Sequence, residues 1–156
     1  MSDWSAGRTT RRVVAGGLFI GWLVALVLPA LTINIGRVPD PPVLAGWEIL
    51  RAGALSIAAF QFGWLANPLL LLVLAMLAWG PPWRSALRVS AGLLVLCTLD
   101  TLDLFLRPDY YTFEGAHAGY YVWVVVNLVA AVATFVLTSS RPKVAEDTNT
   151  SKATIP

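Results

Sequence analysis

Four long apolar stretches, separated by short polar or proline-containing segments, dominate the pattern along the chain. Each has about the 20 residues that a helix needs to cross the ~30 Å hydrocarbon core of a bilayer. Most end at helix-breaking residues, such as Gly80-Pro81-Pro82 after the second stretch and Arg107-Pro108 after the third. The pattern predicts an all-α fold: a polytopic membrane protein with a four-transmembrane-helix bundle. The predicted spans are residues 13–31, 60–79, 86–106 and 119–139.

The remaining segments are polar or short. Residues 13–139 are predicted to form a single membrane domain, flanked by a tail at 1–12 and a disordered tail at 140–156. Between the first two spans, the turn residues PDPP precede GWEILRAGALSIAAF. This order predicts a short amphipathic or re-entrant helix near the outer membrane surface.

Composition supports the bilayer as the partner of these helices. Of the 156 residues, 57% are hydrophobic and only 13% are charged. A soluble domain of this size has no interior large enough for so much apolar sequence. The formal net charge of +2 comes from scattered residues, so the composition gives no indication of nucleic acid binding.

The distribution of basic residues indicates how the chain is oriented across the membrane. Cytoplasmic termini place eight basic residues on the inside and three on the outside, as the positive-inside rule requires. The inner set is Arg8, Arg11, Arg12, Arg84, Arg88, Arg141, Lys143 and Lys152, and the outer set is Arg37, Arg51 and Arg107. Both termini are therefore predicted to be cytoplasmic.

Asn67-Pro68 is an unusual polar pair inside an apolar stretch. If the second helix leaves the membrane at Trp79, Asn67 lies about 18 Å from the inner edge, which is too deep for a full span to begin there. Two structures remain open. A kinked helix runs from Phe60 to Trp79, or a short helix over residues 52–66 meets a half-helix that begins at Asn67. Both leave backbone groups that need partners inside the membrane.

The same spacing argument places other polar residues near this depth. It predicts a candidate buried polar cluster of Asn67, Pro68, Asp100 and Asn127. An intramembrane carboxylate at Asp100 is expected to seek the two asparagines or the free amides near Pro68. Asp103 and Arg107 are four residues apart on one helix face, so they form a candidate ion pair. The cluster is either structural glue between helices or a transport or ligand site.

Two sequence pieces carry a family resemblance. "WLANP" precedes the apolar part of the second span, and "GYYVW" opens the fourth span. From about Leu28 to Val125, the chain resembles a group of small uncharacterised four-span bacterial inner-membrane proteins. The resemblance implies a bacterial inner membrane and four helices, and it transfers no catalytic residue.

The sequence leaves the function open between classes. It lacks the common nucleotide-binding, metalloprotease and hydrolase motifs, and we assign no catalytic residue, metal site or cofactor. The favoured hypothesis is a non-enzymatic interaction or accessory subunit, which binds a larger membrane complex or a second copy of itself. The alternative is a small proton-linked or solute transporter that acts as an oligomer through Asp100. A lipid-modifying enzyme at the outer face is a third class, but it needs a nucleophile or metal that we cannot assign.

Overall fold

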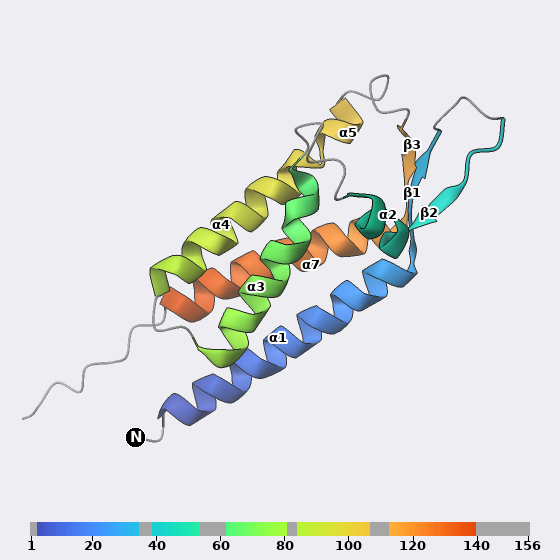
Figure 1. Ribbon diagram of the computed structural model, residues 1–156. Helices are drawn as coiled ribbons and strands as arrows, with labels where there is room; N and C mark the ends of the chain where they lie inside the picture. The colour runs from blue at the N-terminus through green and yellow to red at the C-terminus, as the bar shows by residue number, and fades with distance from the viewer. Residues whose placement is uncertain (1–2, 35–38, 54–61, 81–83, 107–112, 140–156) are drawn as a thin grey trace, which may run out of the picture.

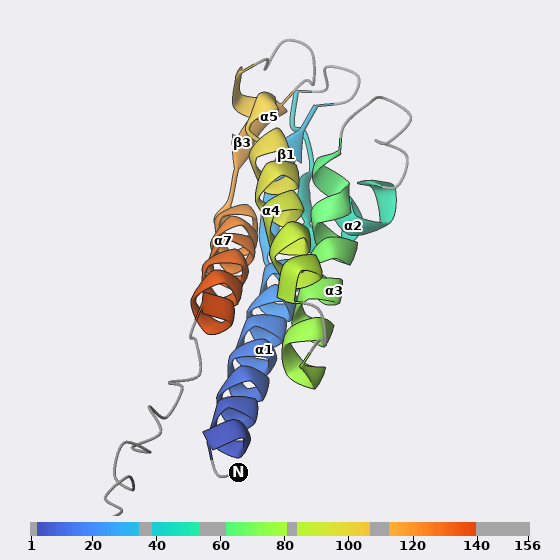
Figure 2. The ribbon, with the colours of Figure 1, turned by 90° about the vertical axis from the view of Figure 1, so that its left-hand side faces the viewer.

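The structure is a computed structural model that describes residues 3–34, 39–53, 62–80, 84–106 and 113–139. Four long helices make up most of it and lie side by side (Figures 1 and 2). They are α1 (Asp3–Val27), α3 (Ala66–Trp79), α4 (Arg84–Asp100) and α7 (Ala118–Ser139). Both α1 and α4 contact α3 and α7, so the helices surround one narrow core.

Small and branched residues fill that core at helical spacing. In α4 the buried positions are Leu87, Ala91, Leu94 and Thr98, which recur every three or four residues. In α7 a similar stripe includes Ala130, Ala131 and Thr134. Small side chains at these positions allow the helix backbones to approach closely.

A three-stranded antiparallel sheet lies at the end of the helices opposite the N-terminus, which we call the sheet end (Figure 1). The strands are β1 (Pro29–Ile33), β2 (Val43–Ala45) and β3 (Phe113–Ala116), with β1 in the centre. Leu31 of β1 is opposite Leu44 on one side and Ala116 on the other. The prediction of a helical fold is confirmed in its coarser form, because the described residues are mostly helical. The sheet was not predicted: the connections after the first and third long helices pair with each other through their backbones.

Short helices complete the sheet end. They are α2 (Gly46–Gly53), the 3-10 turn η2 (Gly63–Leu65) and α5 (Asp103–Leu106). The α2 helix is amphipathic, as expected for part of the outer segment, but residues 54–61 lie outside the described residues.

The helices do not coincide with the predicted spans. The first helix ends at Val27 and is followed by β1, and α3 begins at Ala66 rather than at residue 60. The first helix begins at Asp3, so most of the predicted tail at 1–12 is helical. The third span was predicted to continue to residue 106, but α4 ends at Asp100 and a turn separates it from α5. The predicted C-terminal tail lies outside the described residues.

Two helices are long and apolar enough to cross a membrane, judged by length and composition among the described residues. They are Gly7–Val27 and Ala118–Ser139. The apolar helix Gly63–Trp79 is shorter. A count of four spans stays a prediction.

Candidate ligand-binding cavity

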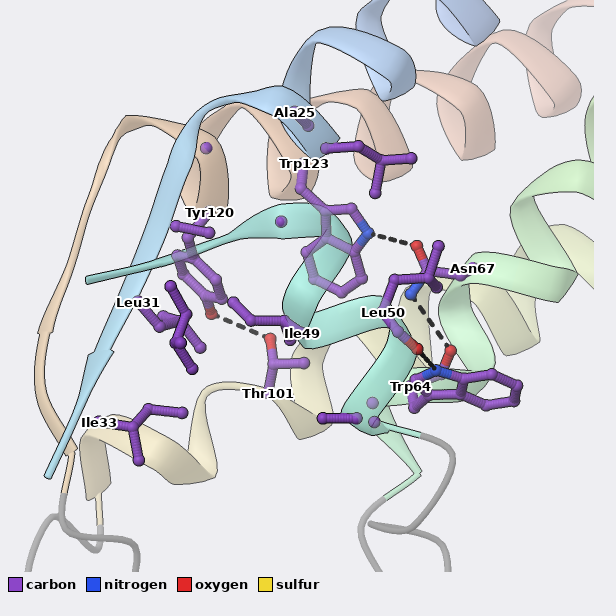
Figure 3. Close-up of a pocket in the computed structure, with 18 of the residues that line it drawn as sticks. Ala25, Leu31, Ile33, Ile49, Leu50, Trp64, Asn67, Thr101, Tyr120 and Trp123 are labelled. Atoms are coloured by element: carbon purple, nitrogen blue, oxygen red, sulfur yellow. Dashed lines mark hydrogen bonds between the residues drawn. The ribbon is translucent and has the colours of Figure 1, made fainter. Parts of the chain in front are cut away.

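A cavity of about 340 Å³ lies at the sheet end, between α1, α7, the sheet and the short helix α2 (Figure 3). Backbone packing brings these elements together. Gly119, at the start of α7, lies against the backbone between α1 and β1, where a Cβ atom would be 2.8 Å from the carbonyl oxygens of both Leu28 and Pro29. Most of the cavity wall is aliphatic or aromatic, and it includes Ala25, Leu31, Ile33, Leu44, Ile49, Leu50, Trp64, Tyr120 and Trp123.

Asn67 joins three of the long helices beside this cavity. Its Oδ1 atom accepts a hydrogen bond from the indole N–H of Trp22 in α1 and another from Trp123 in α7, each at 3.0 Å. Its Nδ2 atom donates to the carbonyl oxygen of Trp64 at 3.4 Å. The amide of one α3 residue therefore provides the acceptor for two indoles, of which Trp22 is buried among apolar side chains.

Asp100 caps the beginning of the helical segment that contains η2 and α3. Its Oδ2 atom accepts hydrogen bonds from the backbone N–H groups of Phe62 and Gly63, both at 2.8 Å. The first amides of a helix lack partners within the helix, and the helix dipole favours negative charge there. Asp100 thus ties the end of α4 to the start of α3.

Further hydrogen bonds pair other polar groups of the wall with one another. The hydroxyl groups of Thr101 and Tyr120 lie 2.9 Å apart, and the indole N–H of Trp64 donates to the carbonyl oxygen of Leu50 at 2.8 Å (Figure 3). The indole and hydroxyl groups of the wall are therefore bonded within the protein, and the cavity presents mainly carbon atoms to a ligand.

The predicted polar residues do not form one buried cluster. Asn67 and Asp100 both line the cavity, but Asn67 is half-buried and Asp100 is exposed. Pro68 is exposed in the first turn of α3, where its missing N–H leaves no helical bond unmade. Asn127 is fully buried, and neither polar atom of its side chain has a hydrogen-bond partner among the described residues. Asn127 lies two turns into α7 and is not among the described residues that line the cavity.

Of the candidate ion pair of Asp103 and Arg107, only Asp103 lies among the described residues. Asp103 is the first residue of α5 and lines the cavity, whereas Arg107 lies outside the described residues. The pairing of Asp103 with Arg107 stays a prediction.

Sequence reasoning missed the tryptophans as partners of Asn67. It treated tryptophan only as a residue of the membrane interface, but an indole N–H within an apolar helix also needs an acceptor. Trp22 lies in the middle of an uncharged stretch, and this position in the sequence indicates an indole that needs a hydrogen-bond acceptor from another helix.

Among the described residues, no group of three or more His, Cys, Asp or Glu side chains could hold a metal ion. Comparisons with known protein families, with characterised proteins and with solved structures find no match to this chain.

Proposed function

We propose that this chain is a multi-pass membrane protein that binds an apolar molecule in the sheet-end cavity without catalysing its conversion. The observation that carries this proposal is the cavity itself, whose wall is mainly apolar and whose indole and hydroxyl groups are hydrogen-bonded within the protein. A volume of about 340 Å³ is at the lower end of the range for small-molecule pockets.

The outer surface of the long helices supports the membrane part of the proposal. Large apolar side chains are exposed on all four helices, which a soluble protein of this size rarely tolerates in such number. They include Val13, Ile20 and Val27 on α1, Leu71 and Leu72 on α3, Val89 and Leu96 on α4, and Val125, Val132 and Val136 on α7. Lipid chains are the natural neighbours of these side chains.

The indole and hydroxyl groups of the cavity wall already have hydrogen-bond partners, which argues for an apolar ligand. A ligand that needs a hydrogen bond from an indole or hydroxyl of the wall would first have to break an internal bond, and an unpaired buried group costs about 1–3 kcal/mol. A hydrocarbon chain makes no such demand and gains free energy when it leaves water. A chain end of a membrane lipid, or a small apolar solute dissolved in the bilayer, fits this chemistry.

The proposal is compatible with an accessory role. A binding protein with small extramembrane parts can deliver its ligand to a larger membrane complex or to a second copy of the chain. A pull-down in mild detergent, with quantitative mass spectrometry of the proteins retained, would detect a stoichiometric partner. Recovery of the chain without one would remove the accessory role and leave ligand binding by the isolated protein.

The carrier alternative rests on Asp100, because this carboxylate lines the cavity. Its two hydrogen bonds to Phe62 and Gly63 give it a capping role that needs no proton transfer. If Asp100→Asn abolishes pH-dependent solute flux in reconstituted vesicles while the protein stays folded, Asp100 serves a carrier function and not helix capping alone.

Two neighbouring positions in β2 provide a direct test of ligand binding. Leu44 is half-buried and lines the cavity, whereas Val43 is exposed and points to the other face of the strand. Leu44→Trp would fill part of the cavity, and Val43→Trp adds the same side chain outside it. Native mass spectrometry of protein purified in mild detergent is expected to show a retained apolar molecule in the original protein and in Val43→Trp, but not in Leu44→Trp. Equal retention in both variants would contradict the proposal.

A further inference from the structure

A second hollow, of about 120 Å³, lies at the end of the helices opposite the sheet. Four helix ends meet there, because α1 and α4 begin at this end and α3 and α7 end there (Figures 1 and 2). We call this hollow the arginine pocket. Its wall includes three arginines, Arg8, Arg11 and Arg84, together with Thr138, Gly80 and apolar residues such as Leu77 and Trp79.

Apart from Asp3 at the start of α1, the helices that form the arginine pocket carry no acidic residue at this end. No Asp or Glu occurs between Asp3 and Asp40, between Glu48 and Asp100, or in α7. The acidic residues of the described helices, apart from Asp3, therefore belong to the sheet end. The remaining acids near this end in sequence, Glu146 and Asp147, lie outside the described residues. Positive charge is concentrated here without an opposite charge from α3, α7 or the pocket half of α4.

Two further arginines use their hydrogen bonds to hold the helix ends. Arg88 donates to Thr138, at 3.1 Å to the hydroxyl oxygen and 3.0 Å to the carbonyl oxygen. Arg12 donates to the carbonyl oxygen of Ala78 at 3.4 Å. These bonds satisfy carbonyl groups at the ends of α7 and α3, where helices leave them unpaired. The arginines of the pocket wall are additional to this structural set.

Gly80 keeps one guanidinium group in the pocket. Its φ angle of +78° belongs to the region that favours glycine. A Cβ atom at this position would lie 3.3 Å and 3.5 Å from the two terminal nitrogens of Arg11. The absence of a side chain therefore lets the Arg11 guanidinium pack against the backbone at the end of α3.

The size and charge of the pocket fit one phosphate group. Its volume is of the order of a few water molecules at about 30 Å³ each, too small for a whole lipid headgroup with its chains. Guanidinium groups form paired hydrogen bonds to phosphate oxygens, and basic pockets between membrane helices on the cytoplasmic side suit anionic headgroups. The exposed Trp79 beside the pocket is typical of the membrane interface.

We propose that the arginine pocket binds a phosphate group, and that an anionic phospholipid of the inner leaflet supplies it. This inference rests on the membrane placement of the proposed function, but it uses residues that the sheet-end cavity does not. Arg8, Arg11 and Arg84 hold the phosphate oxygens, and the lipid chains lie along the exposed apolar faces of the helices.

The test uses the full chain in uncharged detergent and measures its thermal midpoint as phosphatidylglycerol is added. Phosphatidylcholine and inorganic phosphate are added in parallel. Phosphatidylglycerol is expected to raise the midpoint of the original protein. In Arg11→Gln/Arg84→Gln the half-maximal concentration should rise about tenfold or more, since two charge-assisted hydrogen-bonding groups are lost. Arg51→Gln is the matched control, because Arg51 is an exposed arginine of α2 at the sheet end, and its response should not change.

Each other outcome overturns a defined part of the proposal. An unchanged response in the double glutamine variant would show that Arg11 and Arg84 do not bind the phosphate. An equal response to phosphatidylcholine would show that the pocket does not recognise the anionic lipid. An equal response to inorganic phosphate at the same concentration removes the lipid as the source. If the glutamine variant does not fold, Arg11→Lys/Arg84→Lys keeps the charge, and its response should still weaken because lysine lacks the planar fork. Leu44→Trp should retain the phosphatidylglycerol response, so failure of the cavity proposal is distinguishable from failure of this one.

Discussion

The hydrogen bonds between Asn67 and two indoles give the sharpest prediction for stability. Asn67→Ala removes the acceptor of both Trp22 and Trp123 and keeps the α3 backbone helical. Trp22 is buried, with 8% of its surface exposed, so water cannot replace the lost acceptor there. Trp123 is half-buried beside the cavity, where water can reach the indole.

The expected size of the effect follows from these two environments. An unpaired buried donor costs about 1–3 kcal/mol, which applies to Trp22. A side-chain hydrogen bond between membrane helices contributes about 0.6 kcal/mol on average, and up to ~1 kcal/mol is reasonable for Trp123. Asn67→Ala is therefore expected to lower the free energy of unfolding by about 2–4 kcal/mol.

A double-mutant cycle separates these hydrogen bonds from simple loss of packing. Asn67→Ala is made in the original protein and in Trp22→Phe/Trp123→Phe, and unfolding by sodium dodecyl sulfate is followed by circular dichroism. In the phenylalanine background no indole is left unpaired, so Asn67→Ala should cost less than about 1 kcal/mol. An equal cost in both backgrounds would refute the role of Asn67 as the shared indole acceptor.

Substitutions at three further sites, each with its comparison variant, test other contacts. Gly119→Ala places a methyl group against the carbonyl oxygens of Leu28 and Pro29 and should destabilise the protein by about 1–3 kcal/mol. Gly17→Ala is the control, because Gly17 has open space around it, and this variant should be neutral or stabilising when thermal unfolding is measured. Asp100→Ala removes the acceptor of two helix-start amides and should cost about 0.5–2 kcal/mol, as the loss of a helix N-cap does. Asp100→Asn keeps an acceptor and should cost less, and the reverse order would contradict the capping role. Asn127→Leu replaces an unpartnered buried amide with an apolar side chain of similar size and should raise the unfolding midpoint, while Asn127→Asp should lower it.

The long helices could be predicted from the sequence because apolar runs of this length rarely form any structure other than a helix. The sheet was not, because its strands are three to five residues long and pair across a large sequence separation. Nothing in a segment such as Phe113–Ala116 identifies β1 as its partner. Short strands of this kind are decided by tertiary packing rather than by local pattern.

The candidate site was only partly accessible for a related reason. Counting residues along helices gave similar depths for Asn67, Asp100 and Asn127, but depth does not fix the direction in which a side chain points. Asn127 therefore points into the core between helices, whereas Asn67 and Asp100 reach the cavity. Asp100 is exposed because its partners are backbone amides at a helix start rather than buried side chains.

The most direct test of apolar ligand binding is photo-crosslinking in vesicles with a phospholipid that carries a diazirine in its acyl chain. The labelled residues are mapped by mass spectrometry. We expect labelling of cavity residues such as Ile49 and Leu50, in addition to the exposed faces of the long helices. Leu44→Trp should suppress the cavity labels, and Val43→Trp should preserve them. Labelling confined to the exposed helix faces, or unchanged at Ile49 and Leu50 in Leu44→Trp, would contradict the account.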